Sequence, residues 1–156
     1  MTLALALYQP DIAQNTGTLL RLGACLGVPI HIIHPTGFPL TRQALKRGGL
    51  DYVDSATMRE HDSFPAFEIW RQEAGFRLVL LTTKAGLAAY DFVYSAQDML
   101  MVGRESAGVP DAVAASVDAR IRIPMRPGLR SINVALSAAM VVGEAMRQTG
   151  GFSSLS

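Results

Sequence analysis

Two short segments of the sequence combine polar side chains with glycines in patterns suited to holding a ligand. Gly103-Arg-Glu-Ser-Ala-Gly108 places an acid between two glycines, directly after an apolar run. Glycine lets a backbone approach a ligand closely, and a carboxylate accepts hydrogen bonds from it. Residues 123–133 (IPMRPGLRSIN) make a Pro-Gly turn before a helical pattern, with Ser131 near the expected cap. Such a loop exposes backbone groups that can recognise a base edge. The alternative is a plain connection between a strand and a helix, with no ligand.

Several familiar catalytic patterns are absent from the sequence. It contains neither G-x-G-x-x-G nor G-x-x-x-x-G-K-[ST], which argues against a dinucleotide-binding Rossmann site or a P-loop. Ser106 lies one position too late for a nucleophile elbow and no histidine follows it, which disfavours serine hydrolysis. His31 and His34 fall on opposite faces of one expected strand, and His61 lies in an expected loop. Cys25 is expected in the core, so we expect no metal site.

Length, composition and charge describe the molecule that must position these residues. The chain has 156 residues, which predicts one domain. Hydrophobic residues make up 49% and charged residues 17%, which excludes an intrinsically disordered chain. There is no signal peptide and no apolar run near the roughly 20 residues of a membrane span, so we expect a cytoplasmic protein without membrane contact. The net charge of +1 does not by itself indicate a nucleic-acid partner.

Apolar runs alternate with helical patterns along the chain. We expect strands at 3–8, 30–34, 77–82, 99–103 and 120–123, and helices at 15–26, 41–47, 64–74, 110–115 and 132–147. Near-continuous apolar runs favour strands buried on both faces, so the fold class is α/β with a mostly parallel sheet flanked by helices. Ligands of such sheets bind beyond the carboxyl ends of the strands. The segments that follow those ends are 8–15, 82–86, 103–108 and 124–133.

Three ordered motifs resemble those of the SpoU-type methyltransferases of the SPOUT superfamily. The first is Asn15-x-Gly17-x-x-x-Arg21, the second is MLMVGRESAGVP (99–110) and the third is RIPMRPGLRSINVALSAAM (122–140). The compact length and the segments LYQPDIAQNTG, HIIHPTGF, GLDYV and LTTKAG are similar to the tRNA (cytidine/uridine-34-2′-O)-methyltransferase family. The resemblance covers nearly the whole chain.

The resemblance implies one SPOUT domain over residues 1–156, in which the C-terminal part forms a deep trefoil knot. It implies S-adenosyl-L-methionine as methyl donor, bound largely by backbone groups of the knot loops, and no metal. Family members are homodimers, with the last helix at the interface and the RNA site shared between subunits. The positions that match the family's cofactor loops are Leu81, Thr82, Thr83, Gly103, Arg104, Glu105, Ile123, Met125, Ser131, Ile132 and Asn133.

The reaction that the resemblance implies is 2′-O-ribose methylation of the wobble nucleotide (cytidine or uridine 34) of tRNA, in leucine isoacceptors, with the anticodon loop as partner. Catalytic roles fall to Arg21, Asn15 and Glu105. Because arginine stays protonated, Arg21 is expected to orient the hydroxyl and stabilise developing negative charge rather than act as a base. Contacts with the RNA backbone are expected from Lys84, Arg130, Arg42, Lys46 and Arg47.

Two alternatives stay open, namely a ribose methyltransferase acting at another tRNA or rRNA position, and a non-catalytic dimeric protein that binds the cofactor or RNA. Two positions depart from the family pattern. Gly143 stands before Glu144 where the family often has a tyrosine thought to assist RNA handling. The difference bears on RNA affinity and target choice more than on cofactor binding. Arg104 replaces a common proline, and either contacts a phosphate or faces solvent.

Overall fold

A single sheet of six parallel strands organises the computed structural model, which describes residues 2–45 and 58–156. The spatial order of the strands is β3-β2-β1-β5-β4-β6, and every pairing between neighbours is parallel. Central β1 and β5 pair directly although some ninety residues separate them in the chain. The strands are β1 Ala4–Tyr8, β2 Ile30–Ile33, β3 Met58–His61, β4 Arg77–Leu81, β5 Asp98–Val102 and β6 Ala119–Ile121.

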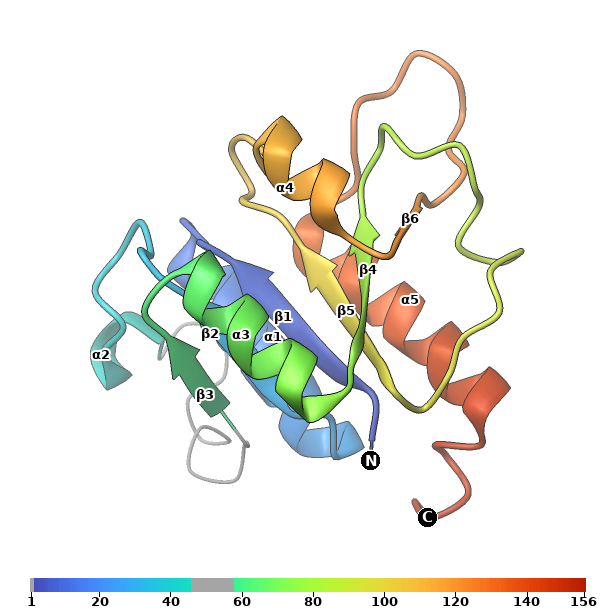
Figure 1. Ribbon diagram of the computed structural model, residues 1–156, viewed down its shortest axis with the longest axis horizontal. Helices are drawn as coiled ribbons and strands as arrows, with labels where there is room; N and C mark the ends of the chain where they lie inside the picture. The colour runs from blue at the N-terminus through green and yellow to red at the C-terminus, as the bar shows by residue number, and fades with distance from the viewer. Residues whose placement is uncertain (1, 46–57) are drawn as a thin grey trace.

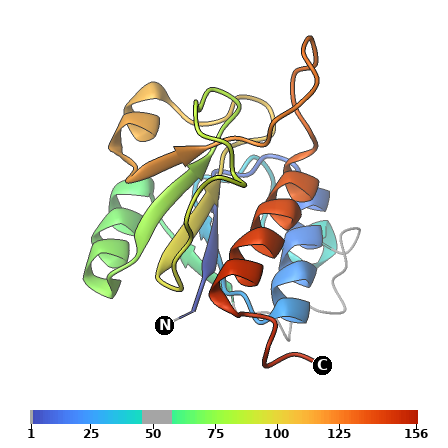
Figure 2. The same cartoon turned by 90° about the vertical axis from the view of Figure 1, so that its right-hand side faces the viewer.

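Helices cover both faces of the sheet, so the molecule has three layers (Figure 1). Figure 2 shows α1 and α5 side by side against one face, with α3 and α4 against the other. The α/β class with a parallel sheet flanked by helices is therefore confirmed. The helices are α1 Ala13–Leu26, α2 Arg42–Leu45, α3 Phe64–Ala74, α4 Asp111–Ser116 and α5 Val134–Thr149. No helix within the described residues is both long enough and apolar enough to span a membrane.

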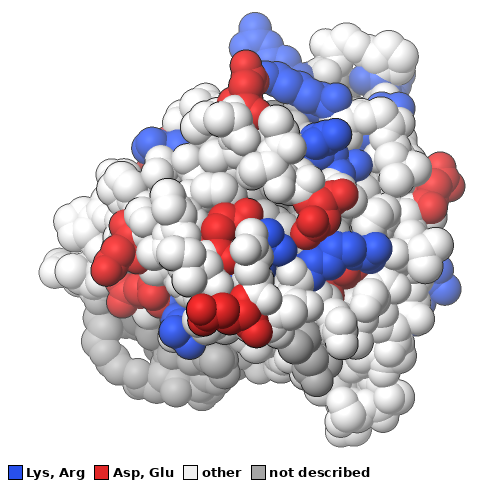
Figure 3. Space-filling model, viewed as in Figure 1, with Lys and Arg blue, Asp and Glu red and all other residues white. Residues whose placement is uncertain are grey.

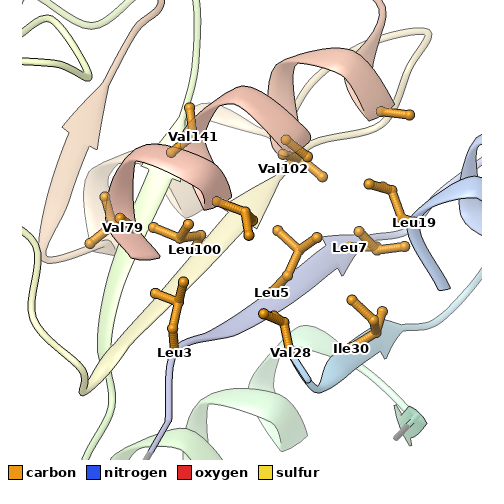
Figure 4. Packing of buried hydrophobic residues seen from close by; sticks show 14 of the residues in the cluster. Leu3, Leu5, Leu7, Leu19, Val28, Ile30, Val79, Leu100, Val102 and Val141 are labelled. Carbon is orange, nitrogen blue, oxygen red and sulfur yellow. The ribbon is translucent and has the colours of Figure 1, made fainter. Parts of the chain in front are cut away.

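The sequence of strand β1 is apolar throughout because both of its faces are buried. Alternate residues of a strand point to opposite faces, and both faces of this sheet are covered. Leu5 and Leu7 pack into the cluster beneath α1 and α5, which also holds Val141 (Figure 4). Ala6 and Tyr8 pack into the second cluster, on the side of α3 and α4. A polar residue on either face of β1 would therefore be buried.

The helix ends follow the expected capping chemistry with one correction. The Ser63 hydroxyl accepts a hydrogen bond from a first-turn backbone N–H of α3, and Gly75 ends that helix with φ +81°. Gly27 ends α1 in the same left-handed conformation. The expectation that α5 starts at residue 132 with Ser131 near the cap is wrong, because Asn133 caps the helix.

Two other expectations were wrong. His61 does not lie in a loop but ends β3, a strand at the edge of the sheet. This strand reads Met-Arg-Glu-His and exposes its two central charged residues, so it has no apolar run to mark it. Cys25 is exposed and not in the core, because it lies on the outward face of α1.

Candidate active site

The carboxyl ends of the strands surround one cavity of about 440 Å³. Its wall comes from the start of α1, the end of β4 with the residues after it, the loop after β5 with part of α4, Arg120 of β6, and residues between 123 and 137 around the start of α5. All of the positions that the resemblance assigns to the cofactor line this cavity, and Asn15 and Lys84 do so as well. The structure therefore brings together three motifs that are separate in the sequence.

The loop after β5 is tightly closed on itself. The Arg104 N–H donates to the Gly108 carbonyl oxygen at 3.0 Å, and the Gly108 N–H donates back to the Arg104 oxygen at 2.8 Å. A Cβ atom on Gly103 would lie 2.7 Å from the Gly108 carbonyl carbon, and Gly108 has φ +65°. Both glycines are thus required by the loop. Its tip presents Glu105 and Ser106 toward the end of β1.

Asp11 and Glu105 hold each other by reciprocal hydrogen bonds. Glu105 Oε2 accepts from the backbone N–H groups of Ile12 at 2.8 Å and of Asp11 at 3.3 Å. Asp11 in turn accepts from the Glu105 N–H at 3.2 Å and from the Ser106 hydroxyl. Arg104 Nη2 lies 3.6 Å from Asp11 Oδ2. Helix α1 has no acidic residue in its first turn, so Glu105 supplies a carboxylate to its positive end.

The two carboxyl groups differ in pKa. Burial and, after it, the Asp11 side chain together raise the pKa of Glu105 to about 7, against the backbone hydrogen bonds from Ile12 and Asp11 that lower it. Burial also raises the pKa of Asp11, but hydrogen bonds with Ser106 and Glu105 and the charge of Arg104 together bring it below its usual value. Near neutral pH Asp11 is therefore charged, and Glu105 is close to the midpoint of its titration.

Asn133 joins the starts of the two helices beside the cavity. Its Oδ1 accepts from the backbone N–H groups of Ala135 at 2.8 Å and Leu136 at 3.2 Å, which caps α5. Its Nδ2 donates to Asn15 Oδ1 at 3.3 Å. Asn15 belongs to α1, so this side chain fixes the first motif relative to the third.

The predicted cationic residues lie at different places. Lys84 is exposed and lines the cavity, whereas Arg21 and Arg130 are exposed and do not line it. Arg42 begins α2, and Lys46 and Arg47 lie outside the described residues. Figure 3 shows Lys and Arg side chains gathered toward the end of the molecule where Figure 1 places the strands' carboxyl ends.

Arg120 and Asp11 are two of the polar residues at the site that were missed from the sequence. Arg120 of β6 lines the cavity and donates to the Ala114 carbonyl oxygen at 2.8 Å. Asp11 makes its contacts with residues 94 and 95 positions away. The position of Asp11, between a buried strand and a helix, was the sequence feature that could have indicated its place at the site. In the two described ranges, no group of three or more His, Cys, Asp or Glu is placed to hold a metal ion.

Comparison with known proteins identifies the family to which this fold and cavity belong. Residues 2–143 match the model of the SpoU rRNA methylase family. The chain belongs to this family. A relative from Ancylobacter novellus named tRNA (cytidine(34)-2′-O)-methyltransferase is 59% identical over 152 residues, or 97% of this chain and 96% of the relative. A relative of the same name from Escherichia coli is 40% identical, over 95% of this chain and 94% of its own.

Solved structures agree with this SpoU methylase in fold. A structure from work on the 2-OH methylation of C/U34 on tRNA superposes with a TM-score of 0.88 at 39% identity, covering 94% of this chain and 95% of that one. An AdoMet-bound rRNA methyltransferase from Sinorhizobium meliloti superposes with a TM-score of 0.84 at 24% identity. It covers 94% of this chain and 56% of that one, and shows the shared fold alone.

Proposed function

We propose that this SpoU methylase transfers a methyl group from S-adenosyl-L-methionine to the ribose 2′-hydroxyl of wobble nucleotide 34 of tRNA, in leucine isoacceptors and in the cytoplasm. The observation that carries the proposal is the meeting of all three motifs at one cavity. The near full-length similarity to tRNA (cytidine(34)-2′-O)-methyltransferases supports the choice of target. S-adenosyl-L-methionine, when bound, supplies an electrophilic methyl group on a positively charged sulfur.

The cavity fits a methyl donor of this size and mixed polarity. A volume of about 440 Å³ lies in the range of small-molecule sites. Leu80 and Val102 give it apolar walls for a base, and the loops at 81–83 and 123–133 offer backbone groups to the polar edges. Arg104 lines the cavity, and its buried Nε has no hydrogen-bond partner within the described residues. This donor is available to a carboxylate such as the one on a methionyl group.

The acceptor hydroxyl has to be held close to the methyl group, and the loss of its proton has to be assisted. We assign orientation of the hydroxyl to Arg21, which remains positively charged and so stabilises negative charge on the oxygen. Arg21 lies outside the cavity wall of its own chain. We therefore propose that a homodimer completes the site, with Arg21 of each copy acting beside the partner's cavity.

The remaining parts of the proposal concern the RNA and the chain path. Lys84 at the cavity and Arg130 in the exposed loop before α5 are suited to phosphates of the anticodon loop, with Arg42, Lys46 and Arg47 extending the contact. We also propose the family's trefoil knot for the C-terminal segments that form the cavity. The position of residues 123–134 beside β4 and β5 supports it.

The test is transfer of a labelled methyl group into bulk tRNA that lacks wobble ribose methylation, followed by nuclease mapping. Label on the 2′-oxygen of nucleotide 34 supports the proposal. Label at another nucleotide retires the wobble assignment, and donor binding without any transfer favours a binding protein. Arg21→Ala should abolish methyl transfer and leave donor affinity nearly intact. The control Arg59→Ala, on edge strand β3, should transfer methyl groups at the wild-type rate. A wild-type rate in Arg21→Ala would refute the role of Arg21.

A further inference from the structure

The contacts of Asp11 join two loops that the sequence separates widely. Its carboxylate meets three consecutive residues of the loop after β5, accepting from the Glu105 N–H at 3.2 Å and from the Ser106 hydroxyl, and lying 3.6 Å from Arg104 Nη2. Glu105 returns the contact at the start of α1, at 2.8 Å from the Ile12 nitrogen. The tip of the loop is thereby fixed against the helix that carries Asn15.

The fold of the loop itself does not depend on Asp11. The two hydrogen bonds between Arg104 and Gly108 and the close packing of Gly103 against Gly108 close the loop without it. The Asp11 carboxylate holds the Glu105 backbone, and the Glu105 carboxylate holds the Ile12 N–H, so the two together set the position of Glu105 relative to α1. The distinction matters because much of the cavity wall, namely Gly103 and the loops at 81–83 and 123–133, lies outside the contacts of Asp11, whereas Arg104, Glu105 and Ser106 line the cavity and contact it.

A third loop fixes Asp11 from behind. The Gly37 N–H donates to the Pro10 carbonyl oxygen at 2.9 Å. A Cβ atom on Gly37 would lie 2.6 Å from the Asp11 Cβ, so the loop after β2 lies directly against this side chain. Only 15% of the Asp11 side chain is exposed. The carboxylate is thus held in one place between the loops that follow β2 and β5.

We propose that Asp11 is a positioning residue for methyl transfer, which holds the tip of the 103–108 loop against the N-terminus of α1 and so sets Glu105 relative to the acceptor side of the site. The inference rests on the proposed function. Most of the wall of the donor cavity lies outside the contacts of Asp11, although Arg104 and Glu105 belong to both. The alignment of donor and acceptor, by contrast, depends on the loop and the helix together. Loss of Asp11 is therefore expected to lower kcat by a larger factor than it lowers donor affinity.

The test measures kcat and KM for tRNA, donor affinity by calorimetry, and thermal unfolding, in wild type, Asp11→Ala, Asp11→Asn and the exposed control Asp91→Ala. We expect kcat of Asp11→Ala to fall by about tenfold or more, since a misplacement near 1 Å can cost about a hundredfold. Donor affinity should change by less than about threefold, and the control should match wild type. Asp11→Asn keeps one acceptor oxygen and should lie between.

A pH profile separates positioning from a merely structural role. Asp11 raises the pKa of Glu105 through its hydrogen bond and its charge. Asp11→Asn removes that charge, so the acid limb of the kcat profile should move to lower pH. An unmoved limb would show that Asp11 does not act through Glu105 and would overturn the proposal.

The remaining outcomes are also decisive. An active wild type with equal kcat in Asp11→Ala overturns the inference alone, while a wild type that transfers no methyl group overturns the proposed function with it. Parallel loss of kcat, donor affinity and thermal stability would make Asp11 a structural residue and overturn the inference. If Asp11→Ala does not fold, Ser106→Ala removes one of the same contacts from an exposed residue. It should lower kcat at unchanged donor affinity, and an unchanged kcat overturns the inference.

Discussion

The Asn133 side chain has two separable contacts, one within α5 and one to α1. In Asn133→Ala the cap is lost, which should lower the free energy of unfolding by about 1 kcal/mol. The bond to Asn15 at 3.3 Å is lost as well, so the third motif is no longer held to the first and donor affinity should fall. Asn133→Asp keeps the capping oxygen but has no amide to donate to Asn15.

Comparing the two variants by thermal unfolding and calorimetry assigns each contact. Asn133→Asp should retain stability and still lose donor affinity, because only the contact to Asn15 is removed. If Asn133→Ala binds the donor as tightly as wild type, the side chain has no part in the donor site and acts as a helix cap alone.

Gly103 and Gly86 are matched glycines in loops that follow neighbouring strands. A Cβ on Gly103 would meet the backbone of Gly108 at 2.7 Å, and backbone atoms cannot move aside as a flexible side chain can. A Cβ on Gly86 has nothing within 4 Å. Gly103→Ala should therefore open the loop and weaken donor binding by about tenfold or more, equivalent to about 1.4 kcal/mol. Gly86→Ala should bind the donor like wild type in calorimetry, and equal affinities in the two variants would contradict this account.

The buried strands are the elements that the sequence predicts best. β1, β2, β4 and β5 lie within a residue of their predicted ends, because strands covered on both faces read as continuous apolar runs. β3 escapes prediction because it lies at the sheet edge and exposes Arg59 and Glu60. The start of α5 was misplaced because Ser131 and Asn133 are both capping residue types, and only the backbone geometry decides between them.

The site also has a part that the sequence predicts and a part that it does not. The rule for parallel sheets places the segments that follow the strands at one edge, so the location of the cavity could be predicted. The contacts of Asp11 could not, because they span 94 and 95 residues and depend on the pairing of β1 with β5. Periodicity gives which face of an element is buried, but not which loop ends are neighbours in space.

Edge strand β3 and β2 hold a histidine pair that should make stability depend on pH. His31 Nδ1 lies 2.9 Å from His61 Nε2, and the Trp70 ring packs at a tilt against both rings. Burial lowers the pKa of His31 to about 4, with the charges of His61 and Arg59 acting in the same direction. Burial and the charge of Arg59 also lower the pKa of His61, against Asp62, which raises it.

Because the folded state favours the neutral forms, this contribution to stability is complete above the unfolded pKa of about 6.5 and is lost as the pH falls toward 4. Between pH 7 and pH 5 the free energy of unfolding of the wild type should fall by about 1–2 kcal/mol relative to that of His31→Gln, as measured by urea denaturation. The raised pKa of Glu105 acts in the opposite direction but equally in both proteins. His34→Gln, at a more exposed pair with Glu60, should keep the pH dependence of the wild type. An equal pH dependence in wild type and His31→Gln would exclude the effect.

The whole molecule leaves an apolar stripe on α5 uncovered. Leu136 is 61% and Met140 42% exposed, and they lie one turn apart on the same face. Gly143 continues this face with open space around its Cβ position, which gives room for a second helix. Light scattering should therefore find about twice the chain mass of 16.7 kDa. Leu136→Glu places a charge in the stripe and should give a folded monomer without methyl transfer, and a wild-type monomer at micromolar concentration would contradict the dimer.

Mixed dimers decide whether two copies share each site. Arg21→Ala leaves the cavity intact, and Gly103→Ala leaves Arg21 intact. At a donor concentration too low to fill the cavity of Gly103→Ala, each variant alone should therefore transfer little or no methyl group. If Arg21 acts beside the partner's cavity, a dimer of one copy of each has one complete site. Random exchange makes about half of the dimers mixed with one good site in two, so an equal mixture should recover about a quarter of wild-type kcat. If Arg21 serves its own cavity, the mixed dimer has no complete site, and an inactive mixture that contains mixed dimers would rule out the shared arrangement.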